Sequence, residues 1–170
     1  MKKSVCGCVI VLLALSVNAS AQLVAGSPED ALFQQITRAT SPAEKITLAN
    51  QFEQEFGDTS GSVMVSIYSI LMDSHEKQQD HRQALAYGEQ IIDMDPDNVT
   101  AYMALCRYLS VNLREDLDQA VEYGQRALTL AEALSDQEAP PNYTPEQWES
   151  YTLQTEEYAR SILSYARTIR

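Results

Sequence analysis

Two segments of nearly the same sequence, QALAYGEQ at residues 83–90 and QAVEYGQR at residues 119–126, decide the fold. Each contains a glycine, Gly88 or Gly124, among residues that otherwise favour a helix. A glycine inside a helix costs about 1 kcal/mol relative to alanine. Both glycines fall within the apolar stripe of their helices, three or four residues from an alanine or isoleucine. The sequence therefore predicts that each glycine lets a neighbouring helix approach closely; a hinge is the alternative.

The similarity between the two segments extends over residues 65–98 and 99–134. Each unit places a tyrosine, a leucine and a sulfur-containing residue on one helical face, followed by alanine, glycine and aliphatic residues on the next helix. The first unit closes with Asp95-Pro96-Asp97-Asn98. This pattern resembles the tetratricopeptide repeat family, whose units are helical hairpins of about 34 residues. Residues 28–60 resemble a weaker first unit, in which Lys45 replaces the alanine.

Four features depart from the family pattern, and the first is that His75 and Leu109 replace the tyrosine. Glycine replaces the aromatic residue after the alanine in both units, and the second unit carries two extra residues between its helices. Glu132 stands where the closing proline of the second unit is expected. None of these departures interrupts the helix-turn-helix pattern, so the predicted hairpins remain.

Capping residues followed by proline mark three helix starts, at Ser27-Pro28, Ser41-Pro42 and Thr144-Pro145. The last two also have the sequence of a capping box. Elsewhere apolar residues recur at three and four positions, which indicates helices rather than strands. The expected helices span residues 28–39, 42–56, 62–77, 81–94, 98–112, 116–134 and 145–169.

The sequence thus predicts an all-α fold, and the resemblance implies a TPR-like solenoid of about three helical hairpins. The repeat domain would cover residues 22–134, with units at about 28–60, 65–98 and 99–134. A proline-containing linker, residues 135–144, would connect it to a long C-terminal capping helix within residues 145–170.

Residues 1–21 have the layout of a secretory signal peptide. Lys2 and Lys3 precede an apolar run of thirteen residues, Val5 to Val17, and Ala19-Ser20-Ala21 supplies a cleavage pattern. A membrane-spanning helix needs about 20 apolar residues, so a retained anchor is the alternative reading. The protein is expected to be exported, either to the periplasm or by secretion. The short signal and the lack of disulfides favour a bacterial source.

The processed chain would be strongly acidic and would have no stable membrane insertion. Removing Lys2 and Lys3 from the 12 basic residues leaves 10, against 24 acidic residues, for a formal net charge of −14. This charge repels phosphate backbones, so nucleic acid is not an expected partner. Cys106 would be the single remaining cysteine, and its apolar surroundings predict a buried core residue.

The sequence contains no recognisable catalytic motif, metal-ligand cluster or phosphate-binding loop. We therefore expect no enzyme activity, no catalytic residue, no metal and no cofactor.

In the resembling family, the first helix of each hairpin lines a groove for a protein or peptide partner. The equivalent positions here are predicted either to contact such a partner or to be solvated polar positions. They are Ser66, Ser69, Asp73, Glu76, Thr100, Met103, Arg107 and Ser110.

The last helix offers a second surface, an aromatic stripe at three-four spacing that includes Trp148, Tyr151, Tyr158 and Tyr165. A repeat array needs a terminal helix with one apolar and one polar face, so capping is the structural interpretation. The far end of the stripe could instead bind a partner or a second copy of the chain. The expected function is an exported scaffold for protein-protein interaction; the alternative is a self-associating structural protein that forms a homodimer through its C-terminal helix.

Overall fold

The computed structural model describes residues 23–59 and 61–170, and the expected signal segment at residues 1–21 lies outside this part. Within the described residues the fold is helical and contains no strand, which confirms the all-α prediction. The elements are α1 (Pro28–Arg38), α2 (Pro42–Phe56), α3 (Gly61–Lys77), α4 (His81–Met94), α5 (Val99–Arg107), the π-helix η2 (Tyr108–Leu113), α6 (Leu117–Leu134) and α7 (Pro145–Ile169).

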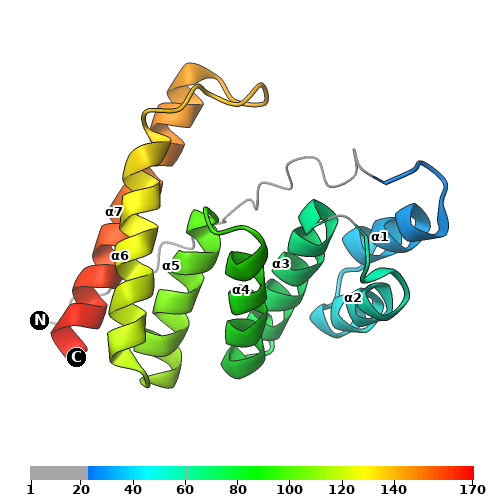
Figure 1. The fold of residues 1–170 in the computed structure, drawn as a ribbon, viewed down its shortest axis with the longest axis horizontal. Coiled ribbons are helices and arrows are strands. Elements are labelled where there is room, and N and C mark those ends of the chain that lie inside the picture. Colours follow the sequence, from blue (N-terminus) through cyan, green and yellow to red (C-terminus); the bar gives the residue numbers. More distant parts are fainter. Residues whose placement is uncertain (1–22, 60) are drawn as a thin grey trace, which may run out of the picture.

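The helices pack in chain order. Figure 1 shows them following one another from α1 and α2 at one end of the molecule to α6 and α7 at the other. Buried side chains form three successive clusters: the first joins α1, α2 and α3, the second joins α3, α4, α5 and η2, and the third joins α5, η2, α6 and α7. The core is therefore a series of shared interfaces along the array, and each helix depends mainly on its immediate neighbours.

The predicted helix starts are correct. The hydroxyls of Ser27 and Ser41 accept hydrogen bonds from the N–H groups of Asp30 and Glu44, each over 3.1 Å. Thr144 accepts from Gln147 N–H at 3.2 Å, and its own N–H donates to the Gln147 side chain at 2.9 Å. This second, reciprocal bond completes a capping box at α7, whereas the box expected at Ser41 has only its first bond.

The helix expected at residues 98–112 differs from the structure in its second half. The α-helix ends at Arg107, and Tyr108–Leu113 continues as a π-helix. A π-helix has more residues per turn than an α-helix, so η2 accommodates part of the two-residue insertion in this unit. The segment ends at Arg114, which has the left-handed φ of 56° and donates its N–H to the carbonyl of Leu109.

Both glycines lie in packed interfaces, as predicted. A Cβ atom on Gly88 would come within 2.8 Å of Leu105 Cδ2, across the contact between α4 and α5. A Cβ atom on Gly124 would lie 3.0 Å from Cys106 Sγ of α5 and 3.3 Å from the backbone Cα of Leu163 in α7. Each glycine therefore allows two helices to approach more closely than any other residue would.

None of the helices in the described part of the chain combines the length and the apolar content needed to cross a membrane.

Replacing either glycine with leucine should reduce the free energy of unfolding by about 1 to 3 kcal/mol, because the added side chain overpacks the interface. The control variants Ala86→Leu in α4 and Ala133→Leu in α6 add leucine at exposed positions of the same helices. These controls should change stability by less than about 0.5 kcal/mol. Urea denaturation of the four variants measures the difference, and unchanged or increased stability of both glycine variants would contradict the packing role.

Candidate functional site

Side chains from α3, α5, η2 and α7 meet in one polar cluster, formed by Glu76, Arg107, Tyr108 and Tyr158. Arg107 Nη2 lies 2.8 Å from Glu76 Oε1, and the Tyr108 hydroxyl donates to Glu76 Oε2 at 2.7 Å. The guanidinium carbon of Arg107 lies 4.8 Å from the centre of the Tyr108 ring. Tyr158 of α7 interacts electrostatically with Arg107 and Glu76. This Glu76 cluster links the first helices of successive hairpins to the last helix.

The junction between α5 and η2 explains how one carboxylate receives two adjacent residues. Neighbouring residues of a helix point in different directions and do not face each other. Arg107 is the last residue of α5 and Tyr108 is the first residue of η2. Both side chains nevertheless reach Glu76, each bonding a different carboxylate oxygen. Glu76 is thereby fixed in position from two sides.

Hydrogen bonds within the cluster keep Glu76 and Arg107 charged although both side chains are partly buried. Burial alone would raise the pKa of Glu76, but hydrogen bonds from Arg107 and Tyr108 outweigh it and hold the pKa below its usual value of 4.5. For Arg107, burial favours loss of the proton, and the hydrogen bond to Glu76 more than compensates, so its pKa is raised. Burial and the nearby Glu76 carboxylate raise the pKa of Tyr108. At neutral pH the cluster therefore holds a carboxylate, a guanidinium and a neutral phenol.

Part of the Glu76 cluster remains open to solvent. The side chains of Glu76 and Arg107 are 34% and 26% exposed, and Tyr158 is half-buried, whereas Tyr108 is fully buried. The ion pair between Glu76 and Arg107 is therefore partly accessible at the surface.

Four further residues of the predicted groove are partly exposed. Ser69 lies seven residues before Glu76, and Thr100 lies seven residues before Arg107, so each occupies the same side of its helix as a member of the Glu76 cluster. The Ser69 hydroxyl donates to the Val65 carbonyl at 2.7 Å.

Ser66 donates to the Ser62 carbonyl at 3.1 Å. Asp73 forms an ion pair with Lys77 at 2.6 Å. The Ser66 and Ser69 hydroxyls and the Asp73 charge are therefore already engaged within α3.

Two of the predicted groove residues are not open to a partner. Met103 is 2% exposed and belongs to the core cluster shared with α6 and α7. Ser110 is fully buried in η2, where its hydroxyl donates to the Cys106 carbonyl at 2.6 Å. The prediction that these two residues line an open groove is therefore wrong. They are buried because α7 packs against α5 and the backbone becomes π-helical at Tyr108, and the repeat pattern indicates neither feature.

The aromatic stripe of α7 is largely covered. Trp148 is buried, stacks on Tyr151 with ring centres 5.4 Å apart, and donates its indole N–H to the Gln137 carbonyl at 3.1 Å. Tyr143 packs edge-on against Trp148 at 5.5 Å. These contacts hold the segment 135–144 against the start of α7. Of the four predicted surface residues, only Tyr165 is exposed, at 39%.

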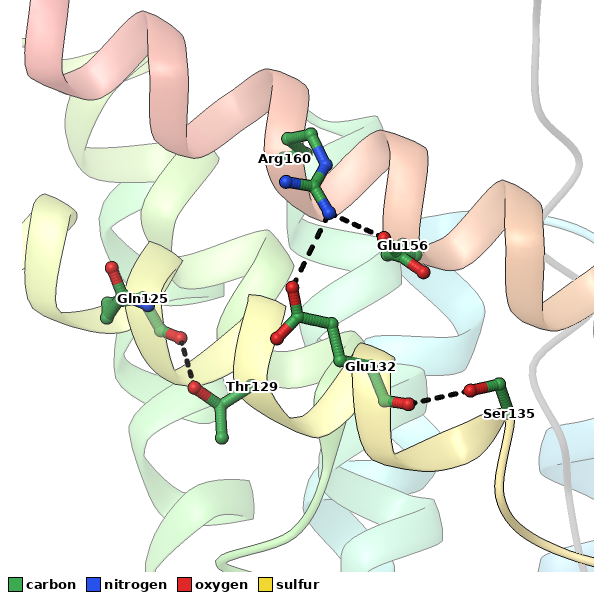
Figure 2. Close-up of polar contacts among 6 residues, drawn as sticks. All are labelled: Gln125, Thr129, Glu132, Ser135, Glu156 and Arg160. Atoms are coloured by element: carbon green, nitrogen blue, oxygen red, sulfur yellow. Dashed lines mark hydrogen bonds and ion pairs between the residues drawn. The ribbon is translucent and has the colours of Figure 1, made fainter.

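Exposed polar side chains also connect α6 and α7. Figure 2 shows Arg160 of α7 between Glu156 of the same helix and Glu132 of α6, at 2.5 Å and 3.4 Å. Glu132 is the residue that replaces the expected closing proline. Both Arg160 and Glu132 are more than half exposed, so this ion pair contributes little to stability.

Two observations on the described residues concern metal binding and nucleophilic chemistry. No group of three or more histidine, cysteine or acidic side chains among them is arranged to hold a metal ion. Cys106 is a buried free thiol, which confirms the predicted core position, and burial raises its pKa to about 11. Such a thiol is almost entirely protonated at neutral pH and is a poor nucleophile.

Tyr108 is the member of the Glu76 cluster that the sequence pattern does not reveal. In a regular helix continuing from residue 98, adjacent residues 107 and 108 would not be expected to converge on one partner. The two extra residues in this unit were the available signal that the helix geometry changes there. Arg107 and Glu76, in contrast, were both expected on the same side of the hairpins.

Comparisons with known proteins do not assign the chain to a family. No protein-family model matches the chain, and no curated protein matches it either. The family resemblance therefore depends on the repeat pattern of the sequence.

Replacing Glu76 with glutamine should destabilise the protein in a pH-dependent way. The pKa of Glu76 is lower in the folded protein than its usual 4.5, so its stabilising contribution is complete above about pH 5 and is lost as the pH falls through the folded-state pKa. We expect a loss of about 1 to 2 kcal/mol at pH 7 for a partly exposed, charge-assisted pair. The difference from wild type should shrink towards pH 3.

Urea denaturation between pH 3 and 7 measures this dependence, with Glu122→Gln on the exposed surface of α6 as the control. A difference between wild type and Glu76→Gln that stays constant over this range would show that the Glu76 charge does not stabilise the fold.

Proposed function

We propose that this chain is an exported, tetratricopeptide-like scaffold that binds another protein or peptide across the face formed by α3, α5 and α7. The repeat pattern of residues 65–98 and 99–134 and the packing of helices in chain order support the solenoid assignment. The expected signal peptide at residues 1–21 supports export. The observation that carries the binding proposal is the Glu76 cluster, which joins three helices at a partly exposed position.

The geometry suits recognition of an extended partner. A segment lying across α3, α5 and α7 would contact side chains from three helices at once. The internal bonds of the Glu76 cluster hold these side chains in place, so binding would require little additional ordering of the scaffold. Tyr158 and Tyr151 are half-buried and offer amphipathic aromatic surface of the kind enriched in protein interfaces. The charges on the face are paired, which favours contacts through shape and hydrogen bonding over net charge.

Matched charge substitutions test the proposed face. One variant carries Ser69→Arg and Thr100→Arg, at half-buried positions about two helical turns before Glu76 and Arg107 on the same sides of α3 and α5. The control carries Ala86→Arg and Ala133→Arg, at exposed positions of α4 and α6. Both variants gain the same charge. Residues 22–170 of each protein are immobilised, incubated with envelope extract from the source organism, and the captured proteins are identified by mass spectrometry.

The proposal predicts that wild type and the control capture the same partner, and that the Ser69/Thr100 variant captures it at least about tenfold less. Circular dichroism establishes that all three proteins are folded. Equal capture by the two variants, or no capture above an empty matrix, would contradict binding at this face.

Self-association through α7 has less support. The apolar side of this helix is buried, including Trp148, Ala159 and Ile162, and its large exposed apolar residues are Leu153 and Tyr165. Single exposed apolar residues are common on monomeric proteins. The covered stripe fits the role of a terminal cap.

Sedimentation velocity of residues 22–170 should therefore show a monomer from about 1 to 100 μM, because stable dimers need a sizeable self-complementary surface. A dimer whose dissociation is promoted by Leu153→Glu and Tyr165→Glu would contradict the capping role and would support the self-associating alternative.

A further inference from the structure

We draw no further inference here: the strongest candidate, a surface hollow at the α1–α2 end of the fold lined by Glu29, Glu53, Glu55 and Asp58, is an acidic cluster for which no second observation in the structure indicates a ligand.

Discussion

The close contact between Gly88 and Leu105 sets the spacing between the second and third hairpins. A Cβ atom at position 88 would overlap Leu105 Cδ2 at 2.8 Å, so the backbone of α4 and the side chain of Leu105 share the space that a larger residue would fill. Leu105 is fully buried. Gly124 has the equivalent role one unit later, where α6 packs against both α5 and α7. The helices can pack in chain order at these distances because the sequence omits two side chains.

The same packing positions the candidate binding face. α5 lies between α4 on one side and α6 and α7 on the other, so its C-terminal end is brought to both α3 and α7. Arg107 then reaches Glu76 and lies beside Tyr158. The π-helical turn that follows adds the Tyr108 hydroxyl to the same carboxylate. Loss of close packing at either glycine should therefore disturb the geometry of the Glu76 cluster and also lower the free energy of unfolding.

Local signals in the sequence predicted most of the helices and their starts. The Ser-Pro and Thr-Pro pairs locate α1, α2 and α7 because a hydroxyl cap and a proline satisfy or remove N–H groups that the first turn leaves unpaired. The packing of both glycines against neighbouring helices was predicted from their place in the apolar stripe. The sequence did not predict the π-helix, because the repeat pattern shows that two residues are added but not how the backbone accommodates them.

The sequence likewise predicted only part of the candidate site. The resemblance to the repeat family implied that Glu76 and Arg107 lie on the same side of their hairpins, and the helical spacing of both residues agrees with this placement. Burial of Met103, Ser110 and Trp148 depends on how α7 and the segment 135–144 fold back onto the array, which is tertiary packing that the spacing of residues does not encode.

A double-mutant cycle at Gly88 and Leu105 tests whether α4 and α5 are as closely packed as the glycine contact indicates. If the two residues share one space, Gly88→Ala should destabilise the wild-type protein, and its cost should fall by about 1 kcal/mol or more in the Leu105→Ala background, where the overlapping atoms are absent. Urea denaturation of the four proteins gives the coupling energy. Additive effects, in which Gly88→Ala changes the stability equally in both backgrounds, would contradict the close packing of α4 against α5.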